Sequence, residues 1–290
     1  MCYVSVMKVA LAQISPHLGD VKKNLALHLE YIEKAKKKRT DLLIFPELSL
    51  TGYTLQDLVP DVAITPGDSK ELAFLLKAAG KTAVVLGFIE ERAEEKGIFY
   101  NSVAYLFDGK ILHIHRKVFL PTFGMFDETR FFAQGKNFFT FPTPNGRTGM
   151  MICRDFLSYG AGYLLFAGGA EIIIAISAAP GRGLSGEEGF GSSRMWELMG
   201  EMLSRFSNVF CIYCNRVGFE DGKPFAGGSF IFNPFGKLLC LASYTESQML
   251  IQDIDMEESR EARKLWPYKR DDKPEIILES LKRIVGKYEY

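Results

Sequence analysis

The stretch Asp41-Leu-Leu-Ile-Phe-Pro-Glu-Leu-Ser49 contains the pattern that decides the fold. Residues 42–45 are a continuous apolar run, which is typical of a strand buried on both faces, and Pro46 ends it because proline has no N–H for a sheet. Farther along the chain, a helix is expected from Asp68 and a second buried strand over 83–89. The pattern therefore predicts strands that alternate with helices around a largely parallel sheet.

The rest of the first half extends this pattern. A short apolar strand is expected over 9–14, and Asp20 is a suitable N-cap for a helix whose apolar residues recur at helical spacing. Two further strands are expected over 100–107 and 111–118, joined by Asp108-Gly109, since this dipeptide supplies the positive φ angles of a tight turn. An antiparallel hairpin therefore joins the parallel core.

The second half repeats the alternation of strands and helices. Strands are expected over 148–153, 172–177 and 209–214, with helices over 156–167 and 192–207. Closing strands are expected over 229–232, 238–242 and 249–254. Two similar β/α halves predict an α/β fold in which two mixed sheets stack face to face with helices outside, because each sheet must be covered on both faces.

The composition excludes several classes of protein. The 290 residues are 47% hydrophobic and 24% charged, and 35 basic residues balance 35 acidic ones, which argues against a nucleic acid or an anionic membrane as partner. No apolar stretch reaches the roughly 20 residues of a membrane span. The chain start lacks a signal-peptide pattern and the five cysteines lack framework spacing, so we expect a cytoplasmic protein. One domain is expected over 7–254, with a charged tail over 255–290 on the surface or at an interface.

Three polar residues stand where strands are expected to end. Cys153 precedes the helix expected over 156–167, so its sulfur would lie at a helix N-terminus that stabilises a thiolate; the alternative is a buried structural cysteine. Glu47 would lie at the C-terminal end of its strand, where α/β sheets bind ligands, or be a loop carboxylate. Lys117 ends the second hairpin strand, where a solvated edge lysine is the common case.

Three motifs contain these residues and occur in a characteristic order. They are Phe45-Pro-Glu-Leu-Ser-Leu-Thr-Gly-Tyr53, Lys117-Val-Phe-Leu-Pro121 and Met151-Ile-Cys-Arg-Asp155. In this order they resemble the nitrilase, or carbon-nitrogen hydrolase, superfamily. The resemblance implies a four-layer α-β-β-α sandwich.

The resemblance also implies a catalytic triad of Glu47, Lys117 and Cys153, supported by a second glutamate for which Glu128 fits best. The chemistry agrees with these roles. A cysteine thiolate attacks an amide carbon, and Glu47 can take the thiol proton and pass it to the leaving amine. The oxyanion that forms can be stabilised by Lys117 and by the backbone N–H of Arg154.

Within the superfamily, residues 120–132 and Tyr53 are similar to the glutamine amidase domain of glutamine-dependent NAD synthetase. That branch has an acidic residue and a tyrosine where this chain has Arg154 and Phe123. No ATP-binding segment is expected after residue 254. Tyr53, Phe123 and Ser177 are the candidate substrate-binding residues.

The sequence thus predicts a cysteine-dependent amidohydrolase that cleaves an amide or carbamoyl C–N bond of a small molecule through a thioester acyl-enzyme, with release of ammonia or an amine. The alternatives are a glutaminase subunit that feeds a separate synthetase, a nitrilase, and a non-catalytic binding module. We expect no cofactor and no metal. The pairs Cys211 and Cys214, and His113 and His115, fit strand residues better than ligands. The G-x-G-x-x-G pattern at 181–186 fits a pocket-rim loop better than a nucleotide site.

Self-association is predicted from the helices of the second half. The segment 156–167 is apolar almost all round, whereas a helix that covers a sheet needs one apolar stripe. We therefore expect a homodimer or higher assembly through these helices; the alternative cover is the tail of the same chain, with Trp266 and Tyr268. The apolar residues concerned are Tyr159, Tyr163, Leu164, Leu165, Trp196, Met199, Met202 and Leu203.

Overall fold

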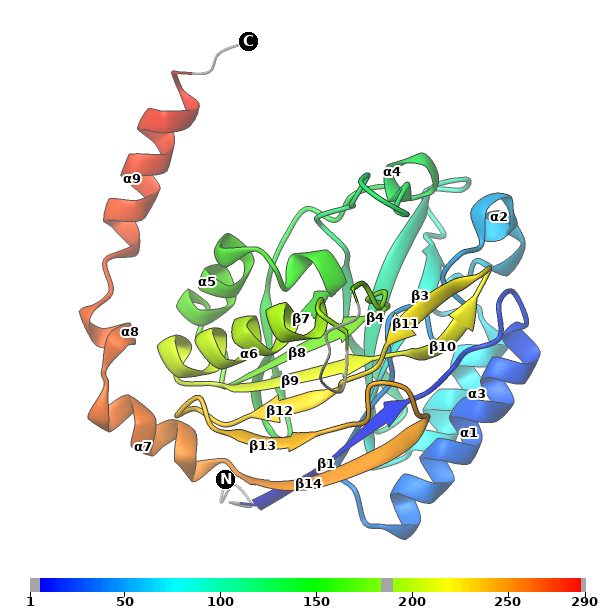
Figure 1. The fold of residues 1–290 in the computed structure, drawn as a ribbon, viewed down its shortest axis with the longest axis horizontal. Coiled ribbons are helices and arrows are strands. Elements are labelled where there is room, and N and C mark those ends of the chain that lie inside the picture. Colours follow the sequence, from blue (N-terminus) through cyan, green and yellow to red (C-terminus); the bar gives the residue numbers. More distant parts are fainter. Residues whose placement is uncertain (1–5, 184–189, 288–290) are drawn as a thin grey trace.

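Two six-stranded mixed sheets form the centre of the computed structural model, which describes residues 6–183 and 190–287 (Figure 1). The strands of the first sheet are β1 (Val6–Gln13), β2 (Leu42–Ile44), β3 (Ala83–Glu91), β4 (Phe99–Phe107), β5 (Lys110–Arg116) and β14 (Gln248–Asp255). Those of the second sheet are β6 (Thr140–Thr143), β7 (Gly146–Ile152), β8 (Ile172–Ser177), β9 (Phe210–Asn215), β12 (Phe230–Phe232) and β13 (Leu238–Leu241). Their orders are β14-β1-β2-β3-β4-β5 and β13-β12-β9-β8-β7-β6.

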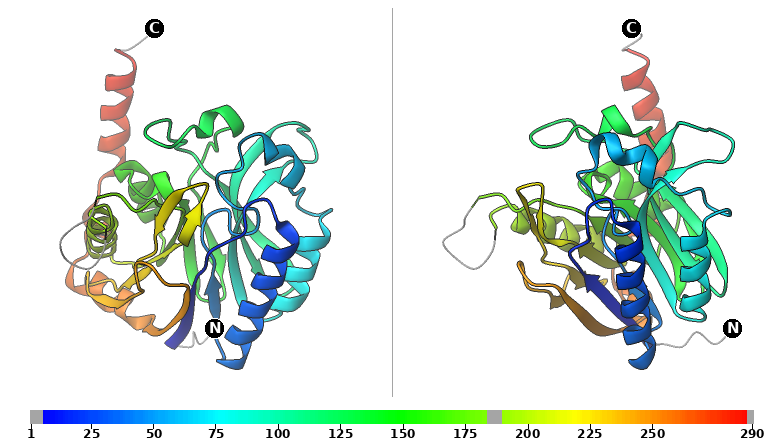
Figure 2. Two further views of the ribbon diagram at one scale, coloured as in Figure 1. Left: turned by 45° about the vertical axis from the view of Figure 1, so that its right-hand side comes forward. Right: turned by 90° about the vertical axis from the view of Figure 1, so that its right-hand side faces the viewer.

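The sheets stack face to face with helices outside, which confirms the predicted four-layer α-β-β-α sandwich (Figure 2). The covering helices are α1 (Val21–Lys37) and α3 (Lys70–Ala79) on the first sheet, and α5 (Tyr159–Ala167) and α6 (Ser193–Ser207) on the second. Alternation along β1 shows both of its faces: Val9 and Leu11 pack between the sheets, whereas Ala10 and Ala12 pack under α1 and α3.

Local capping fixes where the first two long helices begin. The Asp20 carboxylate accepts a hydrogen bond from the Lys23 N–H at 3.0 Å, so the predicted N-cap is confirmed. The second helix begins slightly later than predicted. Its N-cap is Ser69 rather than Asp68, because the Ser69 hydroxyl accepts from the Leu72 N–H at 3.1 Å.

The predicted hairpin places the lysine of the Lys117-Val-Phe-Leu-Pro121 motif. Asp108 and Gly109 have φ angles of 48° and 72°, which are the left-handed values that a two-residue turn requires. Strand β5 then pairs with β4 up to Arg116 opposite Ser102. Lys117 is therefore the first residue beyond the sheet ladder.

The region after the second-sheet strand β7 differs from the prediction. A three-residue 3₁₀ turn, η2 (Cys153–Asp155), follows the strand, and α5 begins only at Tyr159 with Ser158 as its N-cap. The helical segment expected directly after Cys153 is thus only this short 3₁₀ turn, and the helix expected over 156–167 begins three residues later than predicted. Cys153 instead occupies a sharp elbow with a φ of 46°, a left-handed value that is uncommon for a residue with a side chain.

Long-range pairing completes the first sheet. Strand β14 pairs antiparallel with β1, from Val6 opposite Asp255 to Gln13 opposite Gln248. The sequence predicts a strand here but not its partner. It also does not predict β6 or the separate hairpin formed by β10 (Val217–Glu220) and β11 (Lys223–Ala226).

The remaining helices are short or belong to the tail. Short ones are η1 (Gln56–Leu58), α2 (Val59–Val62) and α4 (Glu128–Phe131), and those of the tail are α7 (Glu257–Leu265), α8 (Tyr268–Asp271) and α9 (Pro274–Val285). Helix α9 extends away from the sandwich and buries none of its residues (Figure 1). In the described part of the chain, no helix combines the length and the apolar character that a bilayer crossing requires.

Candidate active site

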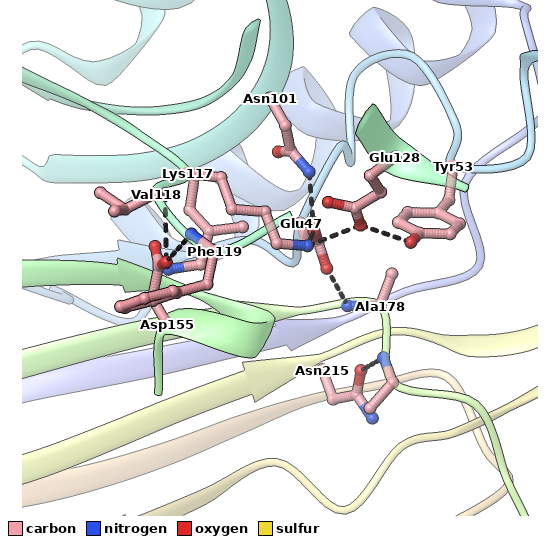
Figure 3. Close-up of polar contacts among 12 residues, drawn as sticks. Glu47, Tyr53, Asn101, Lys117, Val118, Phe119, Glu128, Asp155, Ala178 and Asn215 are labelled. Carbon is pink, nitrogen blue, oxygen red and sulfur yellow. Dashed lines mark hydrogen bonds and ion pairs between the residues drawn. The ribbon is translucent and has the colours of Figure 1, made fainter. Parts of the chain in front are cut away.

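Glu47 lies at the point where β2 has ended and the chain turns across the sheet. Its side chain is fully buried. Oε1 accepts from Asn101 Nδ2 and from Lys117 Nζ, both at 2.7 Å, and Oε2 accepts from the Ala178 N–H at 2.7 Å (Figure 3). Donors from both sheets therefore fix this carboxylate in one orientation.

Lys117 is held between two carboxylates. Its Nζ lies 2.7 Å from Glu47 Oε1 and 2.6 Å from Glu128 Oε1, with the side chain fully buried (Figure 3). Burial alone lowers the pKa of Lys117, but the adjacent Glu128 and Glu47 outweigh it and hold that pKa above its usual range. The site therefore contains a permanent, oriented ammonium group.

Glu128 begins the short helix α4 and closes the other side of the ammonium. Its Oε1 also accepts a hydrogen bond of 2.5 Å from the Tyr53 hydroxyl. Burial raises the pKa of Glu128 to about 7; Lys117 opposes this shift and the charge of Glu47 adds to it. Two buried carboxylates thus share one lysine ammonium.

Cys153 lies beside this cluster with a side chain that is only 4% exposed. Burial and the negative charge of Glu47 raise the pKa of the thiol above its usual range, while Lys117 lowers it. The resting sulfur is therefore a thiol rather than the thiolate expected from a helix N-terminus. The thiol needs a base to become a nucleophile, and Glu47 is the neighbouring carboxylate whose orientation is fixed.

A cavity of about 90 Å³ opens onto Cys153. Its walls are mostly apolar, with two arginines and a serine among them: Pro121, Phe123, Phe126, Cys153, Arg154, Leu157, Pro180, Arg182, Ser192, Met195 and Trp196. A second cavity of about 170 Å³ lies beside Tyr53 and Glu128, and Phe126 lines both. Cys153 therefore faces a small, largely apolar pocket.

The three candidate substrate-binding residues lie in different places. Phe123 lines the Cys153 cavity and is 56% exposed. Tyr53 lines the neighbouring cavity, with its hydroxyl on Glu128. Ser177 is fully buried at the end of β8 and lines neither cavity. Of the three, Phe123 is the one that lines the Cys153 cavity.

The backbone of the elbow supplies a further polar group. The first N–H groups of a helical turn have no carbonyl partner within that turn, and Arg154 is the second residue of η2. Its N–H is therefore free of a partner within that turn and belongs to the residue that directly follows Cys153.

Sequence reasoning does not find Asn101 or the Ala178 N–H, because no motif marks either of them. Both reach Glu47 only through tertiary packing. Asp155 does lie within the cysteine motif, but its buried hydrogen bonds with His115 and with the backbone beyond Lys117 have no sequence signal.

Of the weaker sequence signals, His115 contacts Asp155, and Arg182 of the glycine pattern lines the Cys153 cavity. Cys211 and Cys214 are buried in β9. His113 stacks on Phe141, and burial lowers its pKa to about 4. Within residues 6–183 and 190–287, no group of three His, Cys, Asp or Glu is arranged to hold a metal. Residues 184–189 of the loop at 178–191, and with them the end of the glycine pattern, lie outside the described residues.

Comparison with known proteins places this site in a family. Residues 8–264 match the family described as Carbon-nitrogen hydrolase. The glutamine-dependent NAD(+) synthetase of Acinetobacter baylyi is 34% identical over 256 residues, which cover 87% of this chain but 45% of that protein, so the chain spans less than half of it. An (R)-stereoselective amidase of Pseudomonas sp. is 31% identical over 269 residues, which cover 91% of both chains. The solved carbon-nitrogen hydrolase from Helicobacter pylori G27 superposes with a TM-score of 0.85 at 26% identity, covering 97% of this chain and 99% of that one.

Proposed function

Because this chain belongs to the carbon-nitrogen hydrolase family, we propose that it is a cysteine amidohydrolase for amides of small, apolar carboxylic acids. Hydrolysis of non-peptide C–N bonds is the activity class of the family. The observation that supports the finer proposal is the placement of Cys153 between a fixed Glu47–Lys117 pair and a small apolar cavity.

The acylation step uses Glu47 as base and then as acid. Glu47 takes the Sγ proton of Cys153 while the sulfur attacks the amide carbon, and the carbonyl electron pair becomes an oxyanion. Lys117 and the Arg154 N–H stabilise this negative oxygen. When the oxyanion collapses, the C–N bond breaks and Glu47 returns the proton to the leaving nitrogen, which leaves a thioester.

Water completes the reaction. Glu47 takes a proton from a water molecule that attacks the thioester carbon, and the second oxyanion uses the same two donors. The C–S bond then breaks, the carboxylic acid leaves, and the proton returns to the sulfur of Cys153. Glu128 contacts Lys117 rather than the sulfur, so its role is to hold the ammonium in place.

The apolar walls of the cavity indicate the acyl group. Phe126, Leu157 and Trp196 line a space of about 90 Å³, which suits a short alkyl chain better than a charged one. An apolar, water-poor pocket also strengthens the interaction of Lys117 with the oxyanion.

A glutaminase that supplies ammonia to a synthetase is the second candidate. It is favoured by the 34% identity to a glutamine-dependent NAD(+) synthetase. A nitrilase is the third candidate, because a thiolate can also attack a nitrile carbon.

An ammonia-release assay separates these candidates. Purified protein is given isobutyramide, propionamide, glutamine, N-carbamoyl glycine or isobutyronitrile, with the Cys153→Ala variant as the blank. We expect isobutyramide to give a kcat/KM at least tenfold above that of glutamine. Glutamine as the best substrate would support the glutaminase and overturn the proposal, and turnover of the nitrile alone would support the nitrilase.

We also propose that the protein self-associates through α5 and α6. Tyr159 and Leu164 on α5 are 75% and 52% exposed, although Leu165 and Trp196 belong to the core. The tail covers part of this side: the Tyr163 hydroxyl donates to Asp272 at 2.8 Å, and Tyr268 lies against Phe206. The apolar area outside the tail contact is the proposed interface. A cytoplasmic location stays a prediction.

A further inference from the structure

Asp155 connects the two segments that carry the proposed oxyanion donors. Its carboxylate is fully buried at the end of η2. Oδ1 accepts from the backbone N–H groups of Val118 and Phe119 at 3.1 and 2.9 Å (Figure 3). Oδ2 accepts from the Ile152 N–H at 3.2 Å and lies 3.0 Å from His115 Nε2.

The partners of Asp155 belong to the chain segments that contain Lys117 and Cys153. Val118 and Phe119 directly follow Lys117, and Ile152 directly precedes Cys153. Each carboxylate oxygen of Asp155 has two of these partners, so one rigid side chain contacts both segments. One side chain therefore ties the first sheet's lysine segment to the second sheet's cysteine elbow.

The elbow needs such a tie because its backbone is unusual. Cys153 has a φ of 46°, which a residue with a side chain adopts only when its surroundings enforce it. The bond from the Ile152 N–H to Asp155 spans this residue and closes the turn. Arg154, whose N–H is the second proposed oxyanion donor, lies within the same turn.

We propose that Asp155 is a positioning residue that aligns Lys117 with the Cys153 elbow. In this alignment the Lys117 ammonium and the Arg154 N–H donate hydrogen bonds to the same oxyanion. The inference rests on the proposed amidase reaction. Asp155 touches neither substrate nor sulfur and acts only through the geometry of these two segments.

A second buried carboxylate, Glu90 at the end of β3 in the first sheet, provides a control. Glu90 is 1% exposed and accepts from the side chains of Ser102 and Arg116, each at 2.7 Å. It makes no hydrogen bond with the backbone beyond Lys117 or at the elbow. Glu90→Gln therefore removes a buried carboxylate of the first sheet and leaves the four hydrogen bonds of Asp155 in place.

The test compares two reactions of the Cys153 thiol. When the thiolate adds to acrylamide, the sulfur bonds to the β-carbon of acrylamide and the electron pair of its C=C bond moves toward the carbonyl oxygen. The resulting enolate is then protonated on carbon. This addition requires oxyanion stabilisation. Disulfide exchange with methyl methanethiosulfonate requires the thiolate but forms no oxyanion. The ratio of the two rates at Cys153, followed by peptide mass spectrometry, therefore isolates the oxyanion donors from the exposure of the thiol.

In the Asp155→Asn variant we expect this ratio to fall at least tenfold, and in Glu90→Gln to stay within twofold of the wild-type value. An unchanged ratio in Asp155→Asn, or an equal fall in Glu90→Gln, overturns the inference. Neither reaction needs an amide to be hydrolysed, so the result is independent of whether the proposed function holds. In the hydrolysis assay we expect the kcat of Asp155→Asn to fall while its KM changes by less than threefold.

A milder variant covers the case in which Asp155→Asn does not fold. His115→Leu removes one of the four donors and keeps the bonds from the backbone. We expect its ratio to fall about threefold, in the same direction. A ratio equal to that of the wild type in a folded His115→Leu protein overturns the inference when the aspartate variant cannot be studied.

Discussion

Tyr53 donates a hydrogen bond of 2.5 Å to the same Glu128 oxygen that lies 2.6 Å from Lys117 Nζ. The two donors meet at one carboxylate atom and restrict how Glu128 can rotate. The ammonium is in turn restricted, since its other carboxylate partner, Glu47, is fixed by Asn101 and the Ala178 N–H. The lysine ammonium is therefore held in one place, which is the preorganisation that the proposed stabilisation of an oxyanion requires.

Replacement of the nucleophile should abolish turnover. We expect Cys153→Ala and Cys153→Ser to release no ammonia from isobutyramide while unfolding like the wild type, because an alcohol lacks the acidity and nucleophilicity of a thiol. Ammonia release and circular dichroism on the same samples check this. A Cys153→Ala protein that retains a tenth of the activity contradicts the assignment of the nucleophile.

Loss of the ammonium should lower the rate of the chemical step. Lys117→Ala removes an oxyanion donor, which typically costs about 10² to 10³ in kcat. Steady-state kinetics separate this outcome from a binding role. A raised KM at unchanged kcat would make Lys117 a ground-state binding group instead.

The raised pKa of Glu128 predicts a pH-dependent stability. Because the folded state raises this pKa from 4.5 to about 7, the native protein holds a proton that the unfolded chain releases. The contribution of Glu128 to the free energy of unfolding is thus fully present below pH 4.5 and is lost as the pH rises through 7. Urea denaturation between pH 4 and 8 should show that the stability of the wild type relative to Glu128→Gln decreases across this window. A difference that stays constant with pH contradicts the assignment.

The proposed self-association is testable by light scattering. We expect a mass of at least twice the 32.6 kDa of one chain, and dissociation when Leu164 and Leu198, both half exposed on α5 and α6, are replaced by Glu. Phe74→Glu on α3, at a similarly exposed position, is the matched control and should leave the mass unchanged. A wild type that is monomeric at high concentration would leave the tail as the cover of these helices.

Sequence patterns predict those features of this molecule that depend on neighbouring residues. Asp108-Gly109 specifies its own turn and Asp20 its own cap, so the hairpin and the first helix follow from local chemistry. The elbow at Cys153 does not follow from local chemistry. The apolar run 156–167 predicts one continuous helix, although Ser158 is the N-cap at which α5 begins. The partner of β14 is also beyond sequence reasoning, since its pairing with β1 depends on how the whole chain folds back.

The candidate site divides in the same way. Glu47, Lys117 and Cys153 are marked by motifs, whereas Asn101 is an unremarkable strand residue until packing brings its amide to Glu47. Geometry also reverses one expectation about electrostatics: burial outweighs the lysine and keeps the Cys153 sulfur protonated at rest.

The pairing of β1 with β14 has a consequence for the order of events during synthesis. Among the described strands of the two sheets, β1 is synthesised before the others, and β14, which covers its outer edge, is synthesised after them. Until then, β1 presents unpaired N–H and C=O groups to other nascent chains. Proteins with such distant contacts fold slowly and expose edges that aggregate. A ribosome stalled before Gln248 would therefore hold an incomplete first sheet, and chaperones that bind extended apolar segments should retain that intermediate.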